Sequence, residues 1–248
     1  MKPMEKRICT IESQRPVAPG VYRMTLTAAG DIRHRCGQFV EVAVPGRYLR
    51  RPLSVSLSEE GRLTLLYKVI GKGTEILSGL PDGMTLEVIT GLGNGFDVTA
   101  CHGRALLLGG GIGAAPLHQL CRDLRAAGRE VTAILGFNSA AEIFLRDELE
   151  ALGASVHIAT ADGSEGIKGL VTDALQTVCP GSDRFYVCGP MPMMRALYPL
   201  LPGDGEFSLE ERMGCGTGLC FGCTVLTTEG PRRICHEGPV FKKSVLPW

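Results

Sequence analysis

The sequence of 248 residues has no net charge, no block of like charges and few aromatic residues, with a single tryptophan. A nucleic-acid surface needs a concentration of basic residues, so this composition argues against nucleic-acid binding. Long hydrophobic runs are also lacking, because the most apolar stretch, residues 105–117, is too short and too rich in glycine to cross a bilayer. Internal repeats and low-complexity linkers are absent. What remains is a globular chain whose 44% apolar residues can build two domains and a small appendage.

Ten cysteines are too few for a disulfide-stapled secreted domain of this length, and the opening run MKPMEKRICTIESQRP has no apolar signal segment. We therefore expect a protein of the reducing cytoplasm. Six of the cysteines are scattered, and we expect them to be small buried apolar residues: Cys9, Cys36, Cys101, Cys121, Cys179 and Cys188.

The other four cysteines follow one another near the C-terminus with the spacing C-x4-C-x2-C-x11-C: Cys215, Cys220, Cys223 and Cys235. This spacing is typical of plant-type [2Fe–2S] sites, in which four thiolates hold two bridged irons. Three glycines lie among them, as a loop wrapped closely around a cluster requires: Gly216, Gly218 and Gly222. Structural zinc is the alternative, but zinc sites usually use two short knuckles and this loop offers only one C-x2-C. The pattern predicts a single-electron carrier.

The rest of the chain divides into two parts with different patterns of predicted secondary structure. Six short β-rich runs separated by turn residues predict a small antiparallel barrel: residues 7–13, 21–27, 38–44, 52–58, 62–70 and 84–90. After Cys101, strands and helices alternate, which predicts a doubly wound α/β domain with a mostly parallel sheet and helices over 114–128 and 141–153. We expect a barrel over residues 1–99, a nucleotide-binding domain over 100–205 and a cluster domain over 206–248.

A glycine run, residues 109–113, stands where the first strand of the α/β domain turns into its first helix, with Pro116 at the helix start. Glycines in this position let a pyrophosphate approach the N–H groups of the helix, although a tight turn without a ligand is the alternative. An NAD-binding Rossmann domain usually has an acidic residue after its second strand, but Gly136-Phe137-Asn138 stands there. The run therefore indicates a variant nucleotide domain.

The order of these segments, closed by Cys188-Gly189-Pro190, resembles the ferredoxin–NADP reductase superfamily. Arg51-Pro52-Leu53-Ser54 resembles its R-x-Y-S flavin motif, with Leu53 where an aromatic ring often stacks on the flavin. Leu66-Tyr67-Lys68 and the turn with Gly73 and Thr74 resemble its second flavin strand and pyrophosphate turn. Arg51 offers a forked cation to phosphate, and the hydroxyls of Ser54 and Thr74 offer donors. The resemblance implies FAD bound by these nine residues, although Arg51 alone is equally consistent with a solvated surface charge.

Within the superfamily the chain resembles the electron-transfer subunit of NAD-dependent dihydroorotate dehydrogenase, through segments such as RRPLSVS, LLLGGGIGAAPL, CGPMPMM and SLEERMGCGTGLCFGC. The resemblance implies that dihydroorotate is oxidised at the FMN of a separate catalytic subunit during pyrimidine (UMP) biosynthesis. Electrons would then reach NAD⁺ through the [2Fe–2S] cluster and FAD of this chain, in a heterotetramer with two of each chain. The alternative is the flavin and iron–sulfur small subunit of an NADH-dependent ferredoxin:NADP oxidoreductase. Two non-enzymatic alternatives, a scaffold without cofactors and a cluster-sensing module, fit the intact motifs less well.

On the nucleotide side we expect Gly111 and Gly113 to receive the pyrophosphate, and Cys188 and Gly189 to lie near the flavin and nicotinamide rings. For Cys188 a purely structural place in a strand is the alternative. No catalytic acid or base is expected in this chain. NAD is expected over NADP, because residues 138–142 carry no lysine or arginine for a 2′-phosphate and include Glu142.

The segment before and within the cysteine loop carries two further sets of candidate residues. Glu210 and Arg212 could place charge near the flavin or a partner, or lie in a solvated loop. Apolar side chains in the loop are expected to contact the partner subunit, or else to pack on this chain's own barrel: Met213, Leu219 and Phe221.

Overall fold

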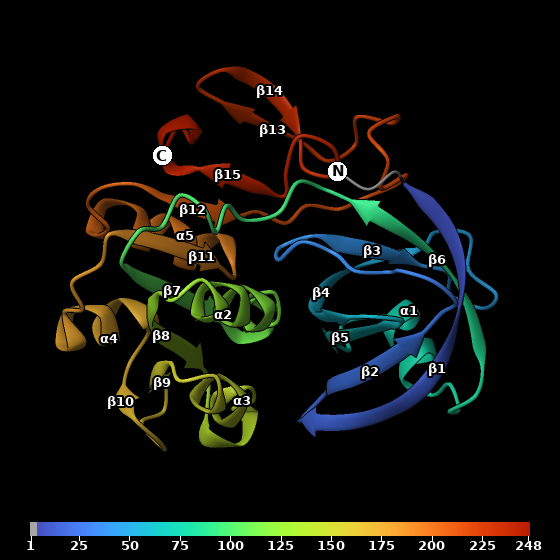
Figure 1. Ribbon diagram of the computed structural model, residues 1–248, viewed down its shortest axis with the longest axis horizontal. Helices are drawn as coiled ribbons and strands as arrows, with labels where there is room; N and C mark the ends of the chain where they lie inside the picture. The colour runs from blue at the N-terminus through green and yellow to red at the C-terminus, as the bar shows by residue number, and fades with distance from the viewer. Residues whose placement is uncertain (1–3) are drawn as a thin grey trace.

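The computed structural model describes residues 4–248 and has two lobes, with the C-terminal segment lying across both (Figure 1). The first lobe is a closed antiparallel barrel with strand order β1-β2-β5-β4-β3-β6. Its strands are β1 (Glu5–Ala18), β2 (Val21–Thr27), β3 (Phe39–Val42), β4 (Arg51–Glu59), β5 (Arg62–Lys68) and β6 (Thr85–Leu92), with helix α1 (Lys72–Ser78) between the last two. All six strands expected from the sequence are present, and the barrel is confirmed.

Alternation of side chains builds the barrel. Along β5, Leu63, Leu65 and Tyr67 point into the barrel core, and Leu66 points outward. Leu66 is nevertheless buried, because the second lobe covers this face of the barrel. One hydrophobic core therefore crosses the junction between the two lobes.

The second lobe is a seven-stranded sheet with order β10-β9-β8-β7-β11-β12-β15, in which all neighbours are parallel except β12 and β15. Its strands are β7 (Arg104–Gly110), β8 (Glu130–Phe137), β9 (Ser155–Thr160), β10 (Ile167–Lys168), β11 (Arg184–Cys188), β12 (Gly205–Ser208) and β15 (Val240–Lys242). Its helices are α2 (Leu117–Ala126), α3 (Arg146–Ala151), α4 (Val171–Val178) and α5 (Met191–Leu197). The predicted doubly wound α/β domain is confirmed.

Two helices are shorter than their sequence pattern predicts. The helix expected over 141–153 covers only Arg146–Ala151, because Leu145 takes a left-handed conformation with φ 66°. Phe144 and Leu145 are both buried, and the Phe144 ring meets the Phe137 ring at a centroid distance of 5.3 Å. Packing of these two side chains thus overrides the helical pattern. The helix expected from residue 114 begins at Leu117, after a 3₁₀ turn over Gly111–Ala114.

The C-terminal segment is tied to the second lobe at both ends. It enters through β12, forms the hairpin β13 (Thr224–Thr227) and β14 (Gly230–Arg233), and returns through β15, which pairs with β12. In Figure 1 this segment, in orange and red, lies above both β12 and the barrel strands β3 and β6. The sequence boundary at residues 205 and 206 stays a prediction, and β12 crosses it. Within the described residues, no helix has the length and apolar character needed to span a membrane.

Candidate functional site

The barrel face toward the second lobe carries part of the expected flavin motif. Pro52 and Ser54 are partly exposed on the same side of β4 as Ser56, whose hydroxyl lies 3.4 Å from Nδ1 of His118 in α2. Leu66 of β5 lies on this face too, in the core shared with the second lobe. These residues line the junction of the two lobes, where a flavin between barrel and nucleotide domain would lie.

Arg51 lies against the first turn of α1. A Cβ atom on Gly73 would lie 2.1 Å from Nε of Arg51, so glycine at this position leaves room for the guanidinium where it stands. Nη1 of Arg51 donates to the carbonyl oxygens of Leu49, at 2.8 Å, and Arg50, at 3.1 Å. The strand and the turn thus form a single basic corner.

Three expected flavin residues have another role in the fold. Leu53 and Tyr67 point into the barrel core, and the Tyr67 hydroxyl donates to Oε1 of Gln14 at 2.8 Å. The Thr74 hydroxyl accepts from the N–H groups of Ile70 and Gly71 and donates to the Gly71 carbonyl, all within its own turn. A flavin contact by the side chains of Leu53, Tyr67 and Thr74 therefore stays a prediction.

The glycine turn of the second lobe packs against the end of β11. A Cβ atom on Gly113 would lie 2.5 Å from the Cys188 carbonyl oxygen and 2.5 Å from Cα of Gly189. Gly111 has φ 52°, in the left-handed region that favours glycine. The structure thus brings the four expected nucleotide residues Gly111, Gly113, Cys188 and Gly189 to one place, at the carboxyl ends of neighbouring strands. In open α/β sheets ligands bind at this edge.

Cys188 is held as a neutral thiol. Burial raises its pKa to about 12, against the opposing effect of a hydrogen bond with Ser208. Such a thiol is not a nucleophile at neutral pH. Glu210 and Arg212 are exposed in the loop that follows β12, so their expected place near the flavin stays a prediction.

Sequence reasoning missed Asp162, the second residue after β9. Its Oδ1 accepts from the N–H and the hydroxyl of Ser164, and those hydrogen bonds lower its pKa. The Ser164 hydroxyl also accepts from the N–H of Ala140, and the Asp162 N–H donates to the Asn138 carbonyl. The loops after β8 and β9 therefore form one acidic rim that also contains Glu142. A search after the third strand of the domain, and not only the second, would have found Asp162.

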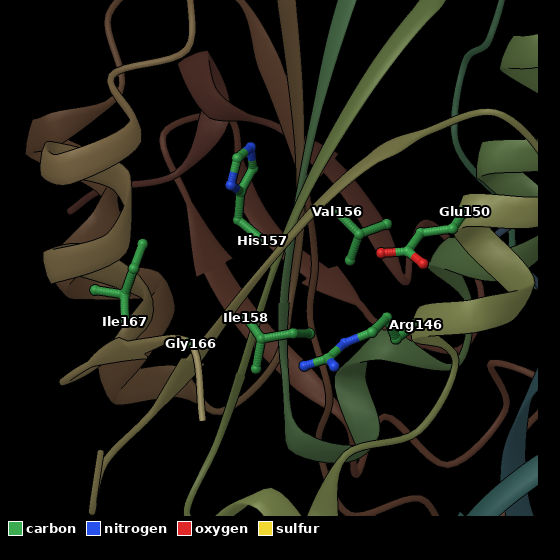
Figure 2. Close-up of a pocket in the computed structure, with 7 residues that line it drawn as sticks. All are labelled: Arg146, Glu150, Val156, His157, Ile158, Gly166 and Ile167. Carbon is green, nitrogen blue, oxygen red and sulfur yellow. The ribbon is translucent and has the colours of Figure 1, made fainter. Parts of the chain in front are cut away.

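An open hollow lies beside this rim, between α3, β9 and β10 (Figure 2). Figure 2 shows Arg146 and Glu150 extending from α3 toward β9. Arg146 forms an ion pair with Glu165, whereas the side chain of a second cation, Lys168, packs against Gly163 beside Asp162.

The four C-terminal cysteines fall into two pairs. The Sγ atoms of Cys223 and Cys235 lie 3.3 Å apart, and Sγ of Cys215 accepts the N–H of Cys220 at 3.4 Å. All four thiols are free. Within residues 4–248 no three Cys, His, Asp or Glu side chains converge as ligands of one metal ion. Two pairs of sulfurs match two metals with two thiolates each better than one tetrahedral ion.

Backbone N–H groups point at every one of the four sulfurs. The sulfur of Cys215 accepts from Thr217, that of Cys220 from Gly222, that of Cys223 from Cys235, and that of Cys235 from Gly218 at 3.1 Å. Burial alone would raise the pKa of Cys215, but hydrogen bonds from Thr217 and Cys220 outweigh it and lower that pKa to about 6. The loop thus stabilises a thiolate, the form that binds iron, at Cys215, whereas burial and the neighbouring Cys223 raise the pKa of Cys235 to about 12.

The cysteine loop rests on the barrel through Gly216. This residue is buried with φ 66°, and a Cβ atom on it would lie 2.3 Å from Oε1 of Glu41 in β3. Glu41 is itself opposite Pro52 in the β3–β4 pairing. One strand therefore separates the cysteine loop from the expected flavin motif.

The apolar residues of the loop are divided between solvent and core. Leu219 is 81% exposed and Phe221 is 63% exposed, whereas Met213 is half-buried against the core of the second lobe. Leu219 and Phe221 are exposed and could contact a partner. Met213 instead packs on this chain, against the core of the second lobe.

Taken together, a flavin-reductase type of barrel, an α/β nucleotide lobe and a cysteine loop define a redox protein that carries an iron–sulfur site beside a nucleotide site. Family models match both parts: the iron–sulfur cluster binding domain of dihydroorotate dehydrogenase B at residues 210–246, and the oxidoreductase NAD-binding domain at 107–198.

Relatives narrow the class further. The chain is 40% identical over 248 residues to the dihydroorotate dehydrogenase B (NAD(+)) electron transfer subunit of Lysinibacillus sphaericus, covering 95% of this chain and 96% of the relative. The subunit of Geobacillus kaustophilus is 41% identical over 246 residues, covering 94% and 95%. This chain belongs to the family of electron transfer subunits of dihydroorotate dehydrogenase B.

Solved structures of other proteins share the fold of this chain. A structure of an NADH-dependent reduced ferredoxin-NADP oxidoreductase superimposes with a TM-score of 0.88 at 29% identity, covering 97% of this chain and 90% of that chain. A cytochrome P450 reductase from Amycolatopsis gives a TM-score of 0.72 at 26% identity, covering 79% and 65%. The first of these extends over the cysteine loop as well as both lobes.

Proposed function

We propose that this chain is the electron-transfer subunit of an NAD-dependent dihydroorotate dehydrogenase of pyrimidine biosynthesis, and that it delivers electrons from dihydroorotate to NAD⁺. Its partner is a catalytic subunit with FMN, and the assembly holds two of each chain. The observation that carries the proposal is the pairing of the four cysteine sulfurs, each accepting a backbone N–H, on a loop one strand away from the flavin motif.

The residues fit a [2Fe–2S] cluster, which would be held by the thiolates of Cys215, Cys220, Cys223 and Cys235 and would supply single-electron transfer. They also fit FAD at the junction of the lobes, with Arg51 toward its phosphates and Ser54 on the face that the ring would cover. A bound flavin exchanges single electrons for a hydride, which the cluster and NAD⁺ cannot do alone.

The protein contributes positions and electrostatics to this chemistry. Gly111 and Gly113 keep the backbone clear of side chains where the nucleotide pyrophosphate would bind, and the neutral Cys188 adds no charge beside it. No group of this chain needs to move a proton from dihydroorotate, because that oxidation belongs to the catalytic subunit.

Analysis of the purified full-length chain tests the proposal. We expect two irons, two labile sulfides and one FAD per chain, and Cys220→Ser should lower iron while FAD stays bound. One zinc per chain without sulfide would rule out the cluster.

A second assay tests the subunit role. The chain alone should pass electrons from NADH to artificial acceptors, yet oxidise dihydroorotate with NAD⁺ only when the catalytic subunit is added. Rapid NAD-linked dihydroorotate oxidation by the single chain would refute the proposal.

A further inference from the structure

We propose that Arg233 is the positioning residue of the iron–sulfur site, which clamps the turn that carries three of the cysteines to the strand that leads to the fourth. Arg233 ends β14, two residues before Cys235. Its Nη1 donates to the Gly218 carbonyl at 2.6 Å, and the N–H of the same Gly218 donates to Sγ of Cys235 at 3.1 Å. One arginine thus holds the carbonyl of the same residue whose N–H points at a ligand sulfur.

The same guanidinium also contacts the other side of the cysteine turn. Its Cζ lies 4.8 Å from the centroid of the Phe221 ring, which stands between Cys220 and Cys223 in the sequence. Phe221 has φ 59°, a left-handed conformation that is unfavourable for a bulky residue. A cation on the ring face stabilises this conformation, and with it the direction in which the chain passes from one cysteine to the next.

Glu237 holds the arginine in place. Its Oε2 accepts from the backbone N–H of Arg233 at 2.6 Å and from Nε at 3.1 Å, and its Oε1 pairs with Nη2. The Arg233 side chain is only 22% exposed. Because one carboxylate binds both the backbone and the fork, the guanidinium has little freedom to leave Gly218.

The neighbouring Arg232 provides a matched contrast. It is 38% exposed and its ion pair is with Glu229 in the hairpin turn, at 3.4 Å. No contact of its side chain with the cysteine turn is found in the described residues. Replacement of Arg232 therefore removes the same charge from the same strand without touching the clamp.

The experiment compares Arg233→Met with Arg232→Met in the full-length holoprotein. We expect Arg233→Met to lose iron to a ferrous chelator about tenfold faster or more, the range for residues that orient metal ligands. It should also change the EPR spectrum of the reduced cluster, which a general loss of stability would leave unaltered. Arg232→Met should match the unmodified protein in both measurements.

Two further variants decide the outcome if Arg233→Met folds poorly. Arg233→Lys keeps the positive charge but lacks the forked guanidinium. Glu237→Gln weakens the contacts that hold the Arg233 guanidinium without replacing Arg233 itself. Both should accelerate iron loss, less than Arg233→Met. An unchanged rate and spectrum in Arg233→Lys and Glu237→Gln, or equality of Arg233→Met and Arg232→Met, would overturn the proposal. The inference rests on the cluster proposed above, and iron and sulfide analysis of the unmodified chain tests that point separately.

Discussion

We expect the choice of nucleotide to depend on single charged residues near the carboxyl ends of β8 and β9. Asp162 and Glu142 present carboxylates from two loops that are hydrogen-bonded to each other through Ser164. Two cations lie in this neighbourhood: Arg146, whose pairing with Glu165 reduces its attraction for an anion, and Lys168, whose side chain packs against Gly163. With Glu165, the carboxylates of the rim still outnumber these two cations. A 2′-phosphate in this place would meet net negative charge.

We therefore expect NADH to be preferred over NADPH, by about tenfold or more in specificity constant, since opposing like charges cost several kcal/mol. Steady-state assays with an artificial acceptor measure this ratio. Asp162→Ser should lower the ratio of the NADH to the NADPH specificity constant, because it raises the specificity constant for NADPH. Glu130→Gln, an acidic residue at the opposite end of β8, should leave it unchanged. Equal specificity constants in the unmodified protein would show that the charge argument fails.

At the scale of single residues, the sequence was most informative for residue types that serve only a few purposes in proteins. Four cysteines at this spacing and a glycine turn after a strand could be found without coordinates. By contrast, the closure of the strands into a barrel decides that the side chains of Leu53 and Tyr67 point into the core. It also decides that the Thr74 hydroxyl makes its hydrogen bonds within its own turn. Spacing along one chain does not contain that information.

At the scale of elements, the cysteine loop and the two lobes are joined by Asn94, just after β6. Its Nδ2 donates to the carbonyls of Glu237 at 3.0 Å and Val240 at 2.7 Å, and its Oδ1 accepts the N–H of Val240 at 3.1 Å. One amide thus ties the end of the barrel to the strand that returns from the cysteine loop.

Asn94→Ala should lower the free energy of unfolding by about 2–3 kcal/mol, because it removes these three hydrogen bonds and a fourth, from the N–H of Gly95, and leaves backbone groups unpaired. Chemical denaturation followed by flavin fluorescence measures the change. Asn138→Ala is the control, since that amide makes an exposed hydrogen bond to Glu142. A similar loss in both variants would argue against a special role for Asn94.

The sequence predicted all six barrel strands and, in the sheet of the second lobe, β7, β8, β9 and β11, because turn residues and hydrophobic runs mark them locally. It did not predict the short strands β10, β12 and β15, the last of which joins a sheet whose other strands precede it by more than thirty residues. A three-residue strand has almost no pattern of its own, and its pairing with β12 is set by tertiary contacts. The short α3 shows the same limit, since the packing of buried Phe144 and Leu145 delays the start of the helix to Arg146.

At the scale of the whole molecule, the two lobes meet at His118 of α2. Its imidazole lies against Ser56 of the barrel, near the ion pair that joins Arg23 of β2 to Glu148 of α3. Burial lowers the pKa of His118 to about 4. The folded protein therefore keeps His118 neutral at a junction that the Arg23–Glu148 ion pair also holds together.

Acid should weaken this junction. Below about pH 6.5 an unfolded chain protonates His118 while the folded chain does not, so stability falls as the pH drops toward 4, by at most about 3 kcal/mol. His118→Gln should make Tm less sensitive to acid between pH 7 and pH 4.5. The difference between variant and parent isolates His118, because all other groups are shared. Parallel Tm profiles would show that His118 is not the responsible group.

The whole chain also needs a surface for its partner, and the exposed apolar tip of the cysteine loop fits that role. Leu219 is the cleaner probe, because Phe221 also stacks on Arg233. Leu219→Asp should weaken association with the catalytic subunit by about tenfold or more, as expected when a charge enters an apolar contact. NADH oxidation with artificial acceptors should be unaffected.

Leu170→Asp serves as the control for the docking prediction, since Leu170 is 62% exposed and caps α4 at the far side of the second lobe. Binding of each variant to the purified catalytic subunit can be measured by titration calorimetry. The tip must lie near the interface if electrons are to enter the cluster from the partner, because Cys220 is the exposed one of the four proposed ligands and lies beside it. Unweakened binding by Leu219→Asp would place the interface elsewhere on the chain and leave the cysteine loop without a route to the partner.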